Sequence, residues 1–258
     1  MDKLNFAKSL AIEAGLLIRE SFIYAGNYSL KCDGSVITPV DIQINRIVVD
    51  SVKKNFPGYS VIGEEQSFKS SQNLGTWICD PIDGSLPYLL SIPTCVFSLA
   101  LLDRKGSPVI AVVYDPFLER MYWAIRGGGA FEDARTLRVN SIAALDKSLI
   151  GNSGRFSKVV SGPKFKTHLY TRSYRPIILH SVIYGAMLVA SGKIAATVLT
   201  GSGMHDAASA KLIVEEAGGK VTDLFGNDQR YDQPLKGAIF SNGLIHKEIV
   251  GIARLHKL

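Results

Sequence analysis

The sequence predicts a layered α/β or α+β protein built as two integrated lobes. Two amphipathic helical segments come first, and five short strand-like runs follow them with Gly, Pro and Asp in between. The second half then alternates strand and helix patterns. Such a sequence of segments is typical of packed helix and sheet layers. We expect an N-terminal α+β lobe over residues 1–145 and a C-terminal α/β lobe over residues 146–258.

The opening segments justify the predicted helices. Apolar residues from Leu4 to Ile18 recur every three to four positions, which predicts a helix over residues 4–22. A second helix should begin after Thr38, because Thr38 fits an N-cap and Pro39 fits the first helical position. This helix should end before Pro57.

Short apolar runs bounded by turn residues predict the strands. In the first half they are Tyr59–Ile62, Thr76–Cys79, Thr94–Leu102, Val109–Tyr114 and Arg120–Ile125. We expect Pro81 to end the second of these strands, because proline cannot donate to a strand ladder. In the second half we predict strands at 137–139, 220–222 and 237–240, and helices at 179–190, at 205–217 with Gly218 as C-cap, and from 245 onward.

Composition and charge fit a folded, cytoplasmic protein. The chain has 258 residues, of which 47% are apolar, and a chain of that length buries on the order of 75% of its unfolded surface without staples. Its net charge is +6, which suits an anionic partner without requiring one. The three cysteines are too few for a disulfide framework and favour a reducing compartment.

No segment has the pattern of a membrane or secretion signal. The N-terminus lacks a basic start followed by a continuous apolar run. The most apolar stretch, Ile177–Ala190, contains His180 and is shorter than the roughly 20 residues that a membrane span needs. We therefore expect no membrane partner.

The segment Trp77–Ser85 is the most informative. An apolar strand runs into Asp80 and Asp83, whose spacing lets both carboxylates face one point across a turn, as a hard divalent cation requires. Gly84 then permits close backbone approach, and its N–H and that of Ser85 would face an anion if they open a helix. The same residues are also typical of a simple helix-capping turn.

Other acids follow or precede predicted elements in the same way. Glu64 and Glu65 come directly after an apolar strand, where their mutual repulsion is unfavourable unless a cation or water relieves it. Asp206 lies at the start of an Ala-rich helix, and Asp41 lies in the first turn of the helix that follows Thr38. Singly, Glu65 fits a solvated charge and Asp206 a first-turn acid. Together these oxygen ligands suit two or three Mg²⁺ or Mn²⁺ ions better than zinc.

Several motifs stand in a fixed order between residues 31 and 219. They are Lys31 with Asp33-Gly-Ser, Thr38-Pro-Val-Asp41, Gly63-Glu-Glu, Asp80-Pro-Ile-Asp-Gly-Ser85, His205-Asp-Ala-Ala and Glu216-Ala-Gly-Gly. In this combination they resemble the lithium-sensitive, Mg²⁺-dependent phosphatases typified by inositol monophosphatase. The resemblance implies a layered α-β-α-β-α sandwich, usually a homodimer, that hydrolyses phosphomonoesters and is inhibited by Li⁺.

The resemblance also implies a set of metal ligands. By motif position, Glu64 and Asp80 with the carbonyl of Ile82 would hold one Mg²⁺, and Asp80, Asp83 and Asp206 would hold a second. Two metals of this kind screen the phosphate and activate water, so no protein nucleophile is needed.

The remaining implied roles concern water and phosphate. Asp41 would contact a third, weaker Mg²⁺ or its water and, with Ser85, orient the attacking water. Backbone N–H groups of Gly84 and Ser85 would bind the phosphate, with Lys31 supporting the charged cluster and Glu65 as a neighbouring acid. Asp83, His205 and Asp206 are expected on the substrate side of the same site.

Three positions depart from the family pattern. Ser85 replaces the usual Thr, which keeps the hydroxyl, and His205 replaces the usual Trp. His205 fits a capping or solvent-facing residue as well as a substrate contact. Animal inositol phosphatases place a substrate-binding Glu near the position of Leu199. The alcohol therefore stays open, with an inositol-1-phosphate-like substrate as the first expectation.

A basic stretch supports alternative substrates. Residues 155–175 contain no acid and six cations, namely Arg155, Lys158, Lys164, Lys166, Arg172 and Arg175. The stretch fits a solvated basic loop and helix, or a site for the second phosphate of fructose 1,6-bisphosphate or of a 3′(2′),5′-bisphosphate nucleotide. The run from Lys31 to Thr38 also resembles histidinol-phosphate phosphatases.

Other functional classes are less well matched. A nucleic-acid or RNA-polymerase-binding protein would use the basic stretch, although few stacking aromatics accompany it. The one-residue Asp-x-Asp spacing of haloacid-dehalogenase-type phosphatases, the Cys-x5-Arg of cysteine phosphatases and the P-loop are all absent from the sequence. We therefore expect a Mg²⁺-dependent phosphomonoesterase.

Overall fold

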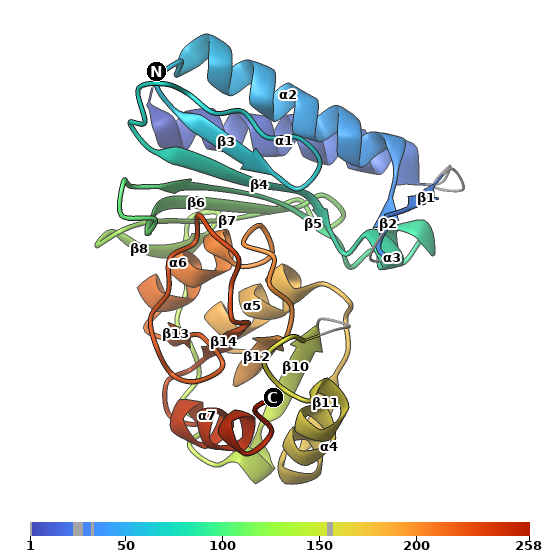
Figure 1. The fold of residues 1–258 in the computed structure, drawn as a ribbon, viewed down its shortest axis with the longest axis vertical. Helices are drawn as coiled ribbons and strands as arrows, with labels where there is room; N and C mark the ends of the chain where they lie inside the picture. The colour runs from blue at the N-terminus through green and yellow to red at the C-terminus, as the bar shows by residue number, and fades with distance from the viewer. Residues whose placement is uncertain (1, 23–27, 32–33, 154–156) are drawn as a thin grey trace.

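The computed structural model describes residues 2–22, 28–31, 34–153 and 157–258. Five layers follow one another (Figure 1): two helices, a seven-stranded sheet, two helices, a five-stranded sheet and two helices. This arrangement confirms the predicted α-β-α-β-α sandwich. Asp33 and Arg155, which the sequence motifs include, lie outside the described residues.

The first layer consists of α1 (Lys3–Phe22) and α2 (Pro39–Asn55), both at the predicted positions. Thr38 caps α2 in a reciprocal capping box, because its hydroxyl accepts from the backbone N–H of Asp41 while the Asp41 carboxylate accepts from the backbone N–H of Thr38. The apolar faces of both helices pack on the large sheet. The cap therefore fixes the Asp41 side chain at the N-terminus of α2.

The large sheet has the strand order β3-β4-β5-β6-β7-β8-β9. Strands β3 and β4 are parallel, and the other neighbours are antiparallel. The bounds are β3 Ser60–Gly63, β4 Thr76–Asp83, β5 Val96–Leu102, β6 Pro108–Asp115, β7 Arg120–Ile125, β8 Gly129–Glu132 and β9 Arg135–Thr136.

The expectation that Pro81 ends its strand is wrong. Strand β4 continues through Pro81 to Asp83, and its pairing with β5 shifts register between Asp80 and Asp83. The pairing of β4 with β3 stops at Cys79, so the missing N–H of Pro81 breaks no bond to that neighbour. The irregularity places the two carboxylates at the end of a buried strand.

One predicted strand is absent from the described residues, and two predicted helices begin later than expected. No strand forms over residues 137–139, where single hydrogen bonds tie Leu137 to Ala130 and Val139 to Ala217. The helices expected from residues 179 and 205 begin three residues later, as α5 (Val182–Ala190) and α6 (Ala208–Glu216). The apolar periodicity continues through the turns that precede these helices, so the sequence predicts both helices too long at their N-terminal ends.

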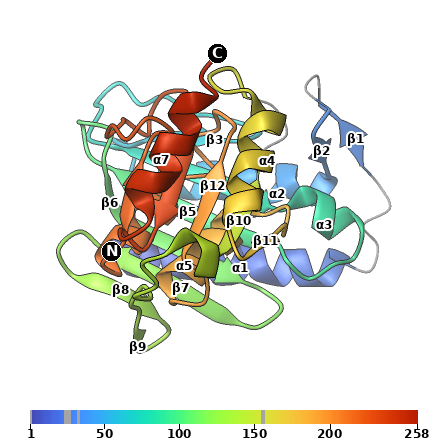
Figure 2. The same ribbon diagram turned by 90° about the horizontal axis from the view of Figure 1, so that it is seen from below.

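The second sheet has the order β11-β10-β12-β14-β13. Helices α5 and α6 lie between the sheets, and α4 (Gly162–Arg172) and α7 (His246–Leu255) cover the outer face, side by side when viewed from below (Figure 2). The strands are β10 Leu149–Ser153, β11 Arg175–Ile177, β12 Ala196–Leu199, β13 Lys220–Thr222 and β14 Ala238–Ser241. The smaller elements are β1 Ser29–Leu30, β2 Val36–Ile37, α3 Ser85–Leu89 and a 3-10 turn at Leu145–Lys147.

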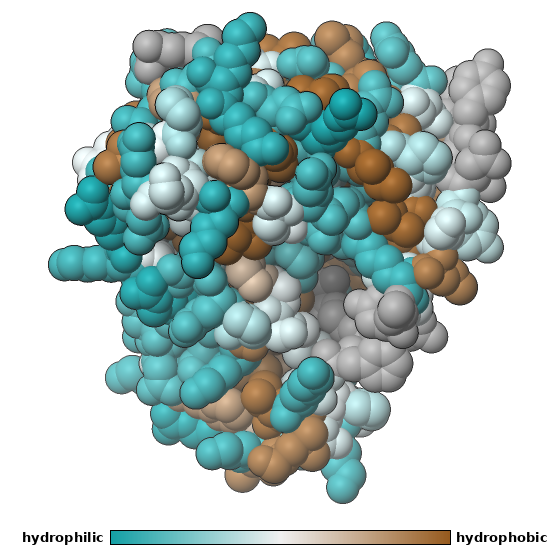
Figure 3. Space-filling view, turned by 45° about the horizontal axis from the view of Figure 1, so that its top comes forward, coloured by the Kyte–Doolittle hydropathy of each residue, from teal (hydrophilic) through white to brown (hydrophobic). Residues whose placement is uncertain are grey.

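Polar residues cover most of the face in Figure 3, and apolar residues show only in patches between them. In the described part of the chain, no helix is both long and apolar enough to span a bilayer.

His246 provides a test of the packing between α7 and the second sheet. The ring is buried, and its two nitrogens lie 2.8 Å from the Thr222 hydroxyl and 2.7 Å from the Ser241 hydroxyl. Burial, helped by the positive charge of Lys220, lowers the pKa of His246 to about 4. The unfolded chain therefore takes up a proton near pH 6.5 while the folded protein does not.

We predict that His246→Asn removes a pH-dependent part of the stability. As the pH falls from about 6.5 towards 4, the wild type should lose up to about 1.4 kcal/mol per pH unit from this group. Urea unfolding of both proteins at several pH values measures the difference in unfolding free energy. That difference should shrink as the pH falls, and a constant difference would contradict the prediction.

Candidate metal and phosphate site

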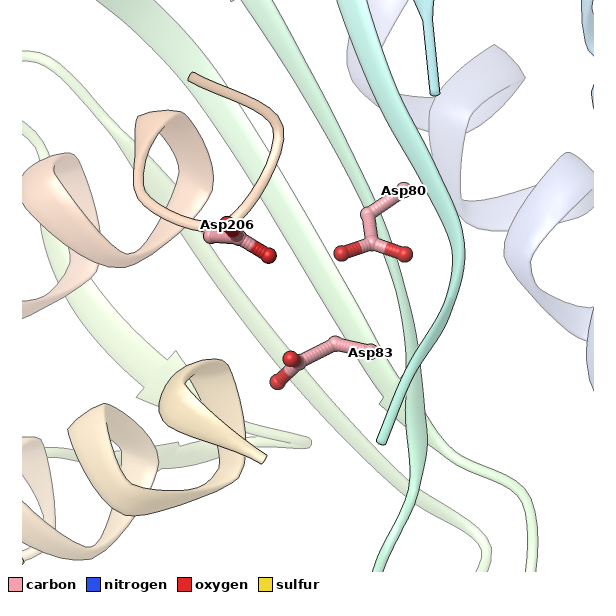
Figure 4. Close-up of side chains that lie close together, drawn as sticks. All are labelled: Asp80, Asp83 and Asp206. Atoms are coloured by element: carbon pink, nitrogen blue, oxygen red, sulfur yellow. The ribbon is translucent and has the colours of Figure 1, made fainter. Parts of the chain in front are cut away.

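Three aspartates from two layers meet at one point (Figure 4). Asp80 and Asp83 lie at the end of β4, and Asp206 lies just before α6. One carboxylate oxygen of each lies within 4.8 Å of the other two. Asp80 and Asp83 are 1% and 6% exposed, whereas Asp206 is half-buried. The structure thus brings together the three residues that the resemblance assigns to the second metal.

The start of α5 holds Asp83 in place. The Ser181 hydroxyl donates to Asp83 Oδ2 over 2.5 Å, and the backbone N–H of Ile183 donates to the same oxygen over 2.7 Å. Ser181 is the N-cap of α5, and the positive end of the helix dipole favours a carboxylate there. The sequence analysis missed these two donors. The serine ahead of an apolar run was the available signal.

Burial makes it unfavourable for all three aspartates to be charged. Burial raises the pKa of Asp80 well above its usual range, and Glu64 and Asp83 raise it further. Burial, followed by Asp206, raises the pKa of Asp83 to about 7. The pKa of Asp206 is also raised by burial. Like charges gathered in a buried site are stabilised by a bound cation.

Gly84 and Ser85 open the short helix α3, as predicted. Gly84 has φ of 98°, in the left-handed region that favours glycine, and is the N-cap of this helix. A Cβ on Gly84 would lie 3.1 Å from the Thr94 carbonyl oxygen and 3.2 Å from Ser181 Cβ. The Ser85 hydroxyl donates to the carbonyl of Ile82 over 3.1 Å. That carbonyl keeps a second lone pair for another ligand.

Asp41 presents one unpaired oxygen in the interior. Its Oδ2 accepts from the Thr38 hydroxyl over 2.5 Å and from the Thr38 N–H over 2.8 Å, whereas its Oδ1 is buried with no hydrogen-bond partner. Burial raises the pKa of Asp41 to about 7, with Glu64 and Glu65 adding to the effect against the Thr38 hydrogen bonds. A buried acceptor without a partner is the feature that a bound cation or water would satisfy.

Lys31 joins the two adjacent glutamates. Its Nζ lies 2.5 Å from Glu64 Oε1 and 2.6 Å from Glu65 Oε1. Burial lowers the pKa of Lys31, but the two carboxylates outweigh this and raise it overall. Within the described residues, Glu64 lies outside the group of three close aspartates, paired to Lys31 instead.

His205 and Leu199, the two positions considered for recognition of the substrate alcohol, lie in different surroundings. His205 lies in the turn before α6 rather than in the helix, with Nε2 3.8 Å from Asp206 Oδ1. Leu199 ends β12 and is only 2% exposed, packed in the core between the sheets. A half-buried imidazole therefore lies beside Asp206, whereas the Leu199 side chain is buried among apolar residues.

Asn45 is a second polar residue, after Ser181, that could not be assigned to the site from the sequence. It is fully buried on α2, one turn after Asp41, and hydrogen-bonds to the backbone of Glu65 and Gln66. The available signal was an Asn next to the apolar positions Ile44 and Val48, because asparagine is seldom buried unless it is hydrogen-bonded.

The site is therefore an oxygen-rich cluster for a hard cation beside a glycine-opened helix, set between two sheets. The model of the inositol monophosphatase family matches residues 2–257, so the chain belongs to this family. Members of the family are metal-dependent phosphatases. The family membership predicted from the sequence motifs is therefore confirmed.

Curated relatives cover almost the whole chain. The chain is 32% identical to the fructose-1,6-bisphosphatase/inositol-1-monophosphatase of Thermotoga maritima, over 98% of this chain and 96% of the relative. It is 30% identical to the histidinol-phosphatase of Mycobacterium tuberculosis, over 96% of each. It is 28% identical to the Nus factor SuhB of Escherichia coli, over 86% and 85%.

Solved structures agree with the fold. The IMPase of Thermotoga maritima superposes with a TM-score of 0.88 at 30% identity, covering 99% of this chain and 98% of that one. An IMPase/NADP phosphatase complexed with Mg²⁺ and phosphate superposes with a TM-score of 0.82 at 25% identity, covering 96% and 93%.

We predict that Gly84→Ala lowers phosphatase activity by about 100-fold, because the new Cβ displaces the loop that would bind phosphate. Gly127→Ala is the matched control. Gly127 also has a positive φ, of 72°, but nothing lies within 4 Å of its added Cβ. Both variants carry left-handed strain of about 1–2 kcal/mol, so Gly127→Ala controls for the strain, and only Gly84→Ala adds the close contacts. Equal activity in the two variants, measured by phosphate release, would contradict the assignment of this loop.

Proposed function

We propose that this protein is a Mg²⁺-dependent phosphomonoesterase that hydrolyses a small phosphorylated metabolite, an inositol-1-phosphate-like ester, by attack of water. The convergence of Asp80, Asp83 and Asp206 carries this proposal. It gains support from the family to which the chain belongs and from relatives named for inositol, fructose-bisphosphate and histidinol phosphates.

The donor set fits magnesium. The three close aspartates, the unpaired Asp41 oxygen and the Ile82 carbonyl are all hard oxygen ligands. We assign one Mg²⁺ to Glu64, Asp80 and the Ile82 carbonyl, a second to Asp80, Asp83 and Asp206, and a third, weaker one to Asp41. Mn²⁺ should substitute, since it accepts the same ligands. Mg²⁺ and phosphate in a solved relative support this choice.

The protein's own groups orient the reactants. When bound, Mg²⁺ screens the phosphate dianion and lowers the pKa of the attacking water. The backbone N–H groups of Gly84 and Ser85 hold phosphate oxygens at the start of α3. Asp41, fixed by Thr38 and with Oδ1 unpaired, accepts a hydrogen bond from the water, and the Ser85 hydroxyl helps to orient it.

Lys31 and His205 complete the assignment around the carboxylates. Lys31 keeps Glu64 and Glu65 together despite their like charge. His205, beside Asp206, is placed to meet the alcohol of the substrate. Asp83 and Asp206 border the phosphate from the side of α5 and α6.

The identity of the alcohol decides between related activities. Leu199 has an apolar side chain and is buried in the core, so it supplies no polar contact to inositol. Histidinol phosphate, fructose 1,6-bisphosphate and 3′(2′),5′-bisphosphate nucleotides are therefore the alternatives. The described part of the basic stretch lies around α4, where Arg172 pairs with Glu248 over 2.7 Å. A nucleic-acid or RNA-polymerase-binding role through this stretch is the alternative of another class, and a relative named as a Nus factor favours it.

The compartment, the oligomeric state and the inhibition by Li⁺ are part of the same proposal. We propose a cytoplasmic homodimer that Li⁺ inhibits. Among the described residues, Cys79 and Cys95 are free and buried, and burial raises the pKa of both thiols above the usual range, which suits a reducing compartment.

Phosphate release from a substrate panel tests the activity. The panel is inositol 1-phosphate, histidinol phosphate, fructose 1,6-bisphosphate, adenosine 3′,5′-bisphosphate and glycerol 2-phosphate, each with Mg²⁺, with EDTA and with added Li⁺. We predict Mg²⁺-dependent, Li⁺-inhibited release with a clear preference for one ester. No release from any ester by folded protein would contradict the proposal, and a salt-sensitive gel shift would then support the nucleic-acid alternative.

Asp83→Asn tests the metal assignment. We predict a loss of activity of about 100-fold or more, and loss of the rise in melting temperature that Mg²⁺ gives the wild type. In EDTA the variant should be at least as stable as the wild type, because a buried like charge has been removed. Asp223→Asn is the matched control, since Asp223 is buried but caps a distant loop. It should lower stability and leave Mg²⁺ dependence unchanged; an active Asp83→Asn would overturn the assignment.

A further inference from the structure

We infer that Asn45 is a positioning residue that sets the affinity for the metal held by Glu64. This inference rests on the proposed function, because it concerns how the same site is held in shape. The contacts of Asn45 with the turn after β3 carry it.

Asn45 hydrogen-bonds to the backbone of the two residues that follow Glu64. Its Nδ2 donates to the carbonyl of Gln66 over 2.8 Å, and its Oδ1 accepts from the backbone N–H of Glu65 over 3.1 Å. Both polar ends of the amide are therefore used, and the side chain is completely buried. Two bonds from one planar amide fix both the position and the direction of this part of the turn.

Asn45 also contacts the residue that precedes Glu64. A Cβ placed on Gly63 would lie only 2.1 Å from Asn45 Oδ1. The backbone at Gly63 therefore approaches the amide more closely than any other residue type would allow. Since Asn45 touches the chain on both sides of Glu64, the Glu64 backbone has little freedom to move.

Helix α2 also holds the carboxylate of Asp41. Asn45 lies one turn after Asp41 on α2, and Thr38 caps that helix through Asp41. The first turns of α2 thus hold Asp41 directly and Glu64 through Asn45. A rigid helix that sets both carboxylates preorganises the ligands before the metal arrives.

Asn45→Ala tests the inference, with Asn242→Ala as the matched control. Asn242 is also a buried Asn whose amide bridges a loop, through bonds to Asn140, Ile142 and Leu244, far along the chain from the carboxylates. For Asn45→Ala we expect the half-saturating Mg²⁺ concentration to rise by about 10-fold or more. At saturating Mg²⁺ the kcat should stay within about two-fold of the wild type.

Binding measured without turnover separates positioning from general stability. Calorimetric titration with Mn²⁺ should show the same loss of affinity in Asn45→Ala and none in Asn242→Ala, although both variants should unfold at lower temperature. If Asn45→Ala does not fold, Asn45→Ser, whose side chain is too short to bridge both partners, is measured in the same way.

The outcomes distinguish the two proposals. Unchanged Mn²⁺ affinity in a folded Asn45 variant, with a wild type that binds Mn²⁺ and releases phosphate, would overturn the inference alone. An equal loss of affinity in Asn242→Ala would show a general effect of stability and would also overturn it. A wild type that neither binds Mn²⁺ nor hydrolyses any ester would instead contradict the proposed function.

Discussion

Repulsion among buried carboxylates is the constraint around which this corner of the molecule is organised. Asp80 and Asp83 are almost fully buried, and Asp206 approaches both. An isolated charge in such a place is strongly unfavourable, and three of one sign are more so. The raised pKa values of all three groups express this conflict. A fold that keeps them together needs compensating positive charge, which helix ends supply in part and a divalent cation would supply in full.

The layered architecture delivers that compensation. Helices α2, α5 and α6 all begin near the carboxylates, and α5 donates directly to Asp83 through Ser181 and Ile183. Helix N-termini carry unpaired N–H groups and partial positive charge, so they favour anions. The strand β4 reaches this point because its irregular pairing carries it past Pro81. The proposed metal ligands and the proposed phosphate-binding loop therefore come together where the two sheets and their helices meet.

The sequence predicted the local features well and the long-range contacts poorly. Periodicity and caps located α1 and α2, and the motifs located every carboxylate that the structure brings to the site. Pro81 was expected to end its strand because proline cannot donate a hydrogen bond to a neighbouring strand. The sequence does not show that β3 stops pairing with β4 at Cys79, before Pro81, so that no such bond is lost there. Ser181 and Asn45 were missed because their partners are distant in sequence, and a single sequence carries no information on which buried polar groups pair.

Asp80, Asp83 and Asp206 are proposed to hold a divalent cation together. Anomalous diffraction from crystals soaked in Mn²⁺ tests it most directly, because Mn²⁺ takes the same oxygen ligands as Mg²⁺ and scatters anomalously. Our account predicts an anomalous peak within bonding distance of all three carboxylates, with a neighbouring peak between Glu64 and Asp80. Ordered carboxylates with no peak between them at saturating Mn²⁺ would contradict it.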